Sequence, residues 1–289
     1  MLNRMMAFSP SSLSEMFSGN LAKMQARLSD TGDVQYVLTL GEQVINVNEL
    51  IGRPVSLRFI QQIHCTACGR KTNKSFNQGY CYPCFTSLAQ CDSCIMSPEK
   101  CHFQAGTCRE PQWGEEFCNR EHFVYLANST GIKVGITRGT QLPTRWLDQG
   151  AVQGLPIARV ATRQISGLFE TIFKQHIADK TNWRALLKED ASVIDLAAQR
   201  DHLFALCRDE IQALQQRFGI DQVQLLDDAP VTGIRYPVEA YPKKINSHNL
   251  DKEPHLTGTL LGIKGQYWIL DNAVINIRKY TGYRVELAI

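Results

Sequence analysis

The chain is organised around two pairs of cysteines, Cys65-Thr-Ala-Cys68 and Cys81-Tyr-Pro-Cys84, with twelve residues between them. This is the spacing of a structural zinc ribbon. Each pair can turn two thiolates toward one point, and tetrahedral Zn²⁺ takes four such sulfur ligands. Gly69 follows the first pair and Gly79 precedes the second, where glycine permits tight turns with positive φ. We therefore predict a structural zinc site at these four cysteines.

More cysteines follow the ribbon. A second four-sulfur site is predicted at Cys91, Cys94, Cys101 and Cys108, with a spacing that matches no standard pair of zinc knuckles. His102, Cys118 or His122 is an alternative for one of these ligands. Two other interpretations stay open: an iron–sulfur cluster, which thiolates also hold, and one metal ion accompanied by unligated buried cysteines. The last cysteine, Cys207, stands in a helical pattern and is predicted to pack in the core.

Length and composition predict about two domains with a real core, because the chain has 289 residues and 44% hydrophobic content. Its first ten residues lack the charged and apolar regions of a secretory signal, and no apolar run reaches the length of a membrane span. Closely spaced cysteines without export indicate a reducing compartment where thiolates bind metal. We therefore expect a cytoplasmic protein without a membrane partner, and disulfides are not expected.

Strand and helix patterns divide the chain. Alternating residues predict strands over 34–40 and 54–63, and a turn over 128–131 between two apolar runs predicts a hairpin over 123–137. Helices are expected over 13–28, 165–177 and 193–218 from their apolar periodicity. The last sixty residues again favour strand, and Gly258, Gly262 and Gly265 suggest a curved sheet. We expect the N- and C-terminal strands to pack together.

The hairpin and the following helix carry a second set of candidate residues. The first strand contains Phe123-Val124-Tyr125 and the second contains Lys133-Val134-Gly135. Arg145, Glu170 and Asn182 follow in order. In order and approximate spacing, residues 122–184 resemble the GIY-YIG endonuclease superfamily, whose members have a small antiparallel sheet with helices and cut phosphodiester bonds with one divalent metal ion.

The resemblance implies a role for each residue. Tyr125 would act as general base or orient the attacking water, Arg145 would steady the phosphate, and Glu170 would hold Mg²⁺ or Mn²⁺. Asn182 would complete the pocket. These residue types suit phosphodiester hydrolysis, which needs a proton acceptor, a cation against the developing charge and a hard-oxygen metal ligand.

The segment also departs from the family pattern. Lys133 replaces the second family tyrosine, as in some branches of the superfamily, and Phe123 replaces the first glycine. Gln149 stands at about the place of the usual histidine, which puts proton transfer in doubt. The whole chain further resembles an uncharacterised bacterial family, a domain of unknown function that joins a cysteine-rich module to this segment. Walker-type loops, nucleophile elbows and His-Glu-x-x-His are absent from the sequence.

Charge adds little to the choice of function. The net charge is +3, too small to indicate nucleic-acid binding by itself, although residues 130–190 hold nine basic and five acidic residues. The leading hypothesis is a zinc protein that acts on nucleic acid, with a metal-dependent phosphodiesterase site. A non-catalytic module that binds nucleic acid or protein is the alternative, and a thiol-based redox or metal sensor is the third.

The predicted class is α+β. A GIY-YIG-like antiparallel sheet with helices follows a zinc-ribbon module, and β regions flank both. The predicted divisions are an N-terminal helix and strands, the cysteine-rich module, the GIY-YIG-like domain, a helical segment and a C-terminal β region, over residues 1–60, 61–121, 122–190, 191–228 and 229–289.

Overall fold

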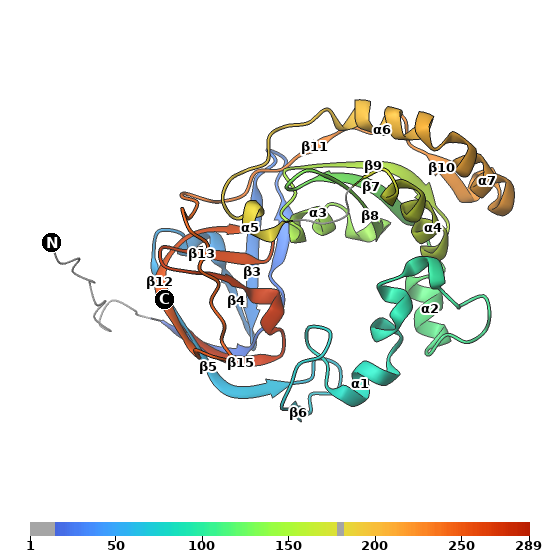
Figure 1. The fold of residues 1–289 in the computed structure, drawn as a ribbon. Coiled ribbons are helices and arrows are strands. Elements are labelled where there is room, and N and C mark those ends of the chain that lie inside the picture. Colours follow the sequence, from blue (N-terminus) through green and yellow to red (C-terminus); the bar gives the residue numbers. More distant parts are fainter. Residues whose placement is uncertain (1–14, 178–181) are drawn as a thin grey trace.

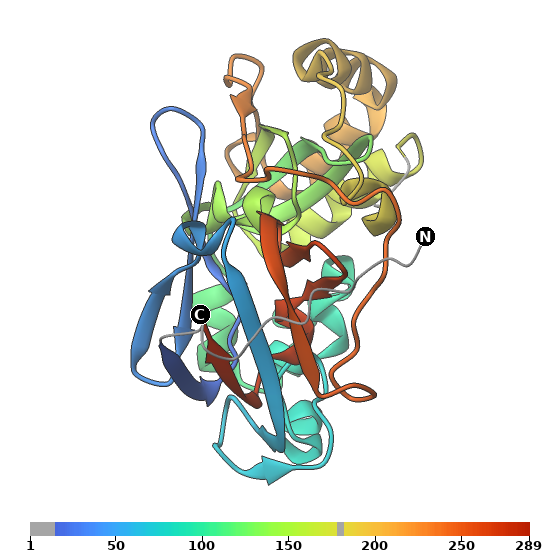
Figure 2. The same ribbon diagram turned by 90° about the vertical axis from the view of Figure 1, so that its left-hand side faces the viewer.

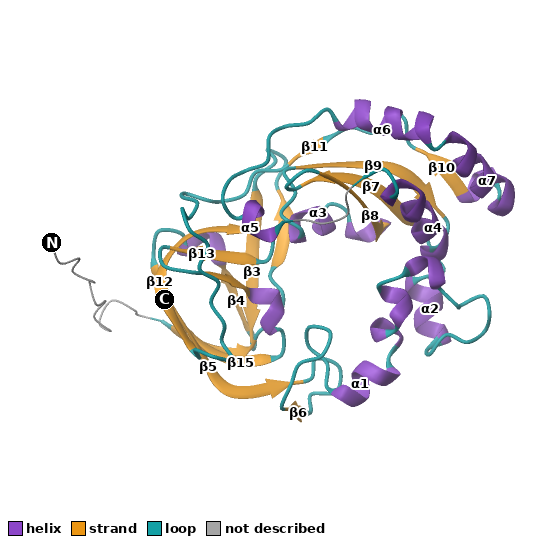
Figure 3. Cartoon of the chain, viewed as in Figure 1, coloured by secondary structure: helices purple, strands orange, loops and turns teal. Residues whose placement is uncertain are grey.

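The computed structural model describes residues 15–177 and 182–289, and the structural statements below refer to these ranges. They form antiparallel sheets and short helices, which confirms the predicted α+β class. One side of the molecule consists mainly of strands, and helices border the other side (Figure 3).

The largest sheet joins segments from both ends of the chain. Its strands are β1 (Met16–Asn20), β5 (Pro54–His64), β6 (Lys71–Thr72), β12 (His255–Lys264), β13 (Tyr267–Leu270), β14 (Val274–Asn276) and β15 (Tyr283–Ala288). The order is β1-β15-β5-β12-β13-β14, and β6 pairs with β5. Because β15 lies between β1 and β5, the terminal strands lie side by side, as predicted (Figure 2). The register shifts between Leu260 and Gly262 in β12, consistent with the expected curvature.

A smaller sheet shares the core of the largest one. Its strands are β2 (Gln25–Leu28), β3 (Val34–Leu40) and β4 (Gln43–Asn46). Alternate residues of β3 are buried in one apolar core with residues of β5, β12 and β15. The predicted helix over 13–28 is wrong for the described residues, since β1 and β2 are strands; residues 13 and 14 lie outside the described ranges. These strands pair with distant β15 and neighbouring β3, and such partners override local propensity.

The third sheet contains the predicted hairpin. Its strands are β7 (His122–Asn128), β8 (Ile132–Arg138), β9 (Gln153–Val160), β10 (Val223–Leu225) and β11 (Thr232–Gly233). β7 pairs with β8 on one side and with β9 on the other. Val124 and Leu126 face a second apolar core formed with the helices, whereas Tyr125 belongs to the core of the other two sheets. This sheet therefore joins the two halves of the molecule.

Seven α-helices lie in the described residues: α1 (Tyr82–Ser87), α2 (Pro111–Phe117), α3 (Thr144–Asp148), α4 (Arg163–Lys174), α5 (Trp183–Leu186), α6 (Leu196–Leu206) and α7 (Arg208–Phe218). The Thr162 side chain caps α4, which ends before His176. The predicted helix over 193–218 is two helices with a break at Cys207, whose side chain is buried in the second core as expected. No helix here is long and apolar enough to cross a bilayer.

The cysteine-rich segment leaves the end of β5, packs against the start of α4 and continues into β7 (Figure 1). Between α1 and α2 it contains the short 3-10 helices η3 (Ala89–Cys91), η4 (Ser93–Ile95) and η5 (Pro98–Lys100). A β-carbon on Gly167 of α4 would lie 2.4 Å from the Glu99 backbone nitrogen, so glycine permits this close approach. The segment is thus attached to the molecule at both ends.

Candidate functional site

The first four cysteines come together as one group. Their four sulfur atoms lie within 4.8 Å of one another, and Cys68 Sγ is 3.8 Å from Cys81 Sγ. Tetrahedral ligands about 2.3 Å from zinc would lie about 3.8 Å apart. The donor set and its spacing therefore fit a structural metal ion such as zinc.

The backbone around this group stabilises thiolates. Gly69 and Gly79 both have positive φ, as expected for the tight turns. Burial tends to raise the pKa of the Cys65 thiol, but backbone N–H groups of Cys81, Cys68 and Ala67 lower that pKa to about 6 overall. Hydrogen bonds from N–H groups favour the charged thiolate, which is the form that binds metal.

The later cysteines are distributed differently from the predicted second set. Cys91 Sγ accepts a hydrogen bond of 3.8 Å from the Asn77 amide and lies near the first group. Cys94 groups instead with Asp92 and His102, and one ligand atom of each lies within 4.8 Å of the others. The Cys101 thiol interacts with the thiol of Cys118 rather than with Cys91.

His122, the other alternative ligand, is fully buried on β7. Its Nδ1 lies 2.7 Å from the Arg120 carbonyl oxygen, and its Nε2 has no hydrogen-bond partner. Burial, helped by nearby arginines, lowers the pKa of His122 to about 4 although the carbonyl contact opposes the shift. The imidazole is therefore neutral at pH 7.

Tyr125 and Gly135 face each other across the β7–β8 hairpin. The tyrosine ring covers the glycine so closely that a β-carbon at Gly135 would lie 2.5 Å from the hydroxyl oxygen. Tyr125 is fully buried, and its ring packs edge-on against Trp146 of α3 at 6.0 Å. Because residue 135 is glycine, the Tyr125 hydroxyl can lie across the neighbouring strand β8.

The Tyr125 hydroxyl contacts two of the other candidate positions, Arg145 and Gln149. It donates a hydrogen bond of 3.3 Å to Gln149 Oε1, and the Arg145 guanidinium contacts the same hydroxyl. Burial raises the pKa of Tyr125, the interactions with Arg145 and Gln149 oppose this, and the charge of Glu170 raises the pKa further. Residues of β7 and of α3 with its C-cap therefore meet here, and Glu170 of α4 lies near enough to act by its charge.

Glu170 and Lys133 border this group. The Glu170 side chain is 12% exposed and forms an ion pair of 3.3 Å with Lys174 one turn later on α4. Lys133 is half-buried on β8, opposite Ala127 of β7. Lys133 and Glu170 each make a further polar interaction.

Asn182 has a structural role as the N-cap of α5. Its side-chain oxygen accepts hydrogen bonds from the backbone N–H groups of Arg184 and Ala185, and so caps the N-terminus of α5. Its own backbone N–H donates to Thr130 Oγ1 in the turn of the hairpin, at 3.3 Å. The residue therefore ties α5 to the tip of the hairpin.

Two further arginines, which the sequence patterns did not single out, lie near this site. Burial lowers the pKa of Arg278, in the 3-10 helix η8 (Ile277–Tyr280); Asp148 opposes this effect, whereas Arg145 adds to it. Burial likewise lowers the pKa of Arg163 at the start of α4, and the charge of Arg145 also lowers it. No local motif connects these three positions, because the fold alone brings them together.

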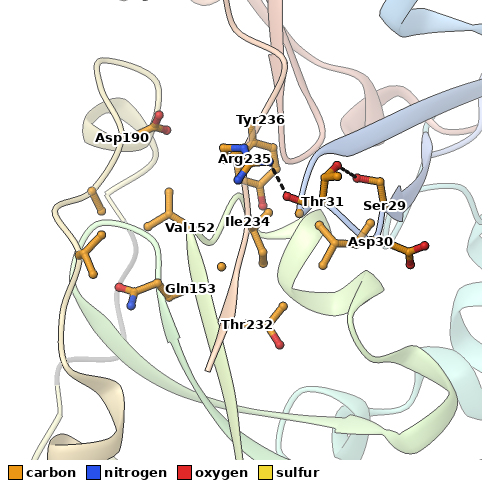
Figure 4. Close-up of a pocket in the computed structure, with 15 residues that line it drawn as sticks. Ser29, Asp30, Thr31, Val152, Gln153, Asp190, Thr232, Ile234, Arg235 and Tyr236 are labelled. Carbon is orange, nitrogen blue, oxygen red and sulfur yellow. Dashed lines mark hydrogen bonds between the residues drawn. The ribbon is translucent and has the colours of Figure 1, made fainter. Parts of the chain in front are cut away.

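A hollow of about 770 Å³ lies away from these groups (Figure 4). It is lined by the β2–β3 turn, the start of β9 and segments 190–193 and 232–236. Tyr125, Arg145 and Glu170 do not line it, and neither cysteine group does. Of its three charged lining residues, Asp190 and Arg235 are already paired with Lys264 and Asp33, and the third is Asp30 in the β2–β3 turn. The hollow therefore offers less chemistry than the Tyr125 site.

A family model described as a protein of unknown function (DUF2797) matches residues 52–285. The match covers most of the chain, from the start of β5 into β15, so the chain belongs to this family. Searches of curated proteins and of solved structures found no match.

Proposed function

We propose that the protein is a zinc-stabilised, cytoplasmic protein that acts on nucleic acid through a GIY-YIG-like phosphodiester site. The observation that carries this proposal is the convergence of Arg145 and Gln149 on the Tyr125 hydroxyl, with Gly135 beneath the ring and Glu170 close enough for its charge to act on that hydroxyl. A cation, a hydroxyl and a carboxylate are the groups that phosphodiester hydrolysis needs.

Each residue has a defined part in this proposal. Arg145 and Arg278 would bind the phosphate, because the two guanidinium groups repel each other and Asp148 alone offers a carboxylate near Arg278 among the charges that act on it. Glu170 would hold a divalent ion such as Mg²⁺, which would neutralise charge that develops on the phosphate oxygens. The raised pKa of Tyr125 favours a neutral hydroxyl that orients water over a phenolate base.

Binding without cleavage is the second candidate, and two observations favour it. Tyr125 is fully buried against Trp146, which limits access to its hydroxyl. Gln149, the hydrogen-bond partner of that hydroxyl, cannot transfer protons as a histidine does. In this case the arginines would bind the backbone of the nucleic acid and the zinc module would support the scaffold.

Cleavage of a panel of single-stranded, duplex and branched DNA and RNA with Mg²⁺ or Mn²⁺ tests the proposal. We expect wild-type protein to cut at least one substrate and Glu170→Gln to lose on the order of 100-fold in rate. Glu42→Gln, at an exposed hairpin turn, is the matched control and should cut normally. Zinc content must be equal in all three proteins.

Binding measurements separate the two candidates. Salt-sensitive binding that is weakened by Arg145→Gln, without any cutting, would assign the protein to the binding class. Failure of wild-type protein both to cut and to bind the whole panel would refute the proposal.

A further inference from the structure

The first turn of α4 gathers three separate cysteine segments. The backbone N–H of Arg163 donates to the Cys118 carbonyl at 2.8 Å, and its Nη2 donates to the carbonyl of Ile95, next to Cys94, at 2.7 Å. The side chain of Gln164 donates to the Cys101 carbonyl at 2.9 Å. These contacts fix the three backbone segments against one helix end.

Two sulfur atoms lie in contact below that turn, and two further cysteines lie near them. The Cys101 and Cys118 thiols contact each other, and both residues line a small cavity of about 20 Å³. Cys94 lies close enough to Cys101 and Cys108 for their charges to raise its pKa. The sulfur of Cys108 packs on α2, where a β-carbon at Gly114 would lie 3.1 Å from it. A cavity of this volume has room for a single water molecule or an ion.

The charge of Arg163 points to thiolates here. Its Nε atom is buried without a hydrogen-bond partner. Among the described residues no carboxylate pairs with this guanidinium, and the groups that stabilise its charge are Cys94, Cys101 and Cys118. A buried cation needs an anionic partner, and four thiolates around one Zn²⁺ leave a net charge of about −2, half of which Arg163 offsets.

We propose that Cys94, Cys101, Cys108 and Cys118 hold a second zinc ion beneath the start of α4. This set replaces Cys91, which lies near the first group, with Cys118. The site fastens the cysteine-rich segment to the helix that carries Glu170, and the inference holds whether or not the protein acts on nucleic acid.

The competing set is Asp92, Cys94 and His102, whose ligand atoms lie within 4.8 Å of one another. Asp92 is already paired with Arg109 Nε at 2.8 Å, and His102 Nδ1 lies 2.9 Å from Thr107 Oγ1. A metal at this place would have to compete with Arg109 for the carboxylate. In the four-sulfur set, the Cys108 thiol donates to the Glu110 carbonyl oxygen at 3.5 Å, and this weak bond lacks the charge of the Asp92–Arg109 pair.

Metal analysis of single-cysteine variants tests the proposal. We expect two zinc ions per chain in wild-type protein, one in Cys118→Ser and two in Cys91→Ser, which is the matched control. His102→Ala should also retain two. One zinc ion in wild-type protein would overturn the proposal, as would loss of zinc from Cys91→Ser or His102→Ala with full content in Cys118→Ser. Iron with visible absorbance would overturn the assignment to zinc.

Cobalt substitution of wild-type protein gives a second test that does not depend on a variant that folds. If both sites contain four sulfurs, the second equivalent of Co²⁺ adds as much thiolate-to-metal absorbance as the first. A second equivalent that adds about a quarter as much would indicate a single thiolate, as in the competing set, and the proposal would fail.

Discussion

The contact between Gly135 and Tyr125 makes the candidate site sensitive to a single methyl group. In Gly135→Ala the new β-carbon would lie 2.5 Å from the hydroxyl oxygen, so the ring or the strand must move. We expect a loss of about 1–3 kcal/mol in the free energy of unfolding, typical of overpacking. Urea unfolding measures this loss.

Gly233→Ala is the control for this substitution. Gly233 lies in β11 of the same sheet, and no atom lies within 4 Å of the position of its β-carbon. Its stability should change little. Equal losses in the two variants would show that the strand position, and not the tyrosine, causes the effect.

The ion pair between buried Lys264 and Asp190 makes the free energy of unfolding depend on pH. Its Nζ is 2.7 Å from Asp190 Oδ1. Burial tends to raise the pKa of Asp190, but hydrogen bonds from Lys264 and Tyr241 hold it below the usual value overall. A carboxyl with a lowered pKa contributes stability that is fully present above its unfolded pKa of about 3.9 and is lost as the pH falls through its folded pKa.

We therefore expect Asp190→Asn to cost on the order of 2 kcal/mol at pH 7, because the ammonium group loses its charged partner. The variant should also lose less stability than wild-type protein between about pH 5 and pH 2. Urea unfolding at a series of pH values measures both effects, with Asp228→Asn at an exposed loop as the control. Parallel pH profiles for wild type and Asp190→Asn would contradict the assignment.

At the scale of elements, the packing of η5 on α4 depends on Gly167. A β-carbon there would meet the backbone nitrogen of Glu99 at 2.4 Å, and backbone atoms cannot rotate away. We expect Gly167→Ala to cost about 2–3 kcal/mol and to reduce the zinc content of the proposed second site. Thr171→Ala, at an exposed position of the same helix, removes only the bond of 2.8 Å from the Thr171 hydroxyl to the Gly167 carbonyl and should change neither quantity appreciably.

Loss of the first metal site should unfold one segment rather than the molecule. The cysteine group is attached to the end of β5, but β5 is held on both sides by β12 and β15. In Cys68→Ser we expect faster amide hydrogen exchange over 65–91 and unchanged exchange in β12 and β15. Hydrogen exchange with mass spectrometry resolves these segments. Faster exchange throughout β12 would contradict local unfolding.

The elements that the sequence predicted are those with a clear local pattern, including β5, whose partners β12 and β15 are distant in the chain. The β7–β8 hairpin and β3 follow from local alternation and turn residues. The first helix was predicted wrongly because β1 pairs with β15, at the other end of the chain. Spacing grouped Cys91 with Cys94, whereas the fold brings Cys118 beside Cys101 because α2 turns back toward α4. Contacts of this kind leave no local signal.

At the scale of the whole molecule, the candidate site depends on both ends of the chain. Asp148, at the end of the helix that carries Arg145, accepts a hydrogen bond of 2.9 Å from Gln266, and the Gln266 carbonyl accepts one from the Ile277 backbone at 2.9 Å. Through these contacts the C-terminal β region places Arg278 near Arg145. The middle segment and the terminal strands therefore form one structural unit, and the terminal β regions help to build the site.

The closeness of Glu15 to Ile289 makes a circular permutant a direct test of this architecture. Glu15 and Ile289 exchange backbone hydrogen bonds of 3.2 and 3.0 Å. Joining Ile289 to Met1 therefore leaves residues 1–14 as the linker. New ends between Asp227 and Asp228 fall in an exposed loop between β10 and β11, where few backbone contacts are lost.

We expect this permutant to fold, to melt within about 5 °C of wild-type protein and to bind the same amount of zinc. A permutant with new ends between Phe59 and Ile60 is the control. That break cuts β5, which pairs with both β12 and β15, so the largest sheet should fail to form. Circular dichroism and zinc content decide the outcome. If the loop permutant unfolds while retaining its linker, the pairing of the terminal strands does not by itself close the sheet, and the order of synthesis of β1 and β15 matters for folding.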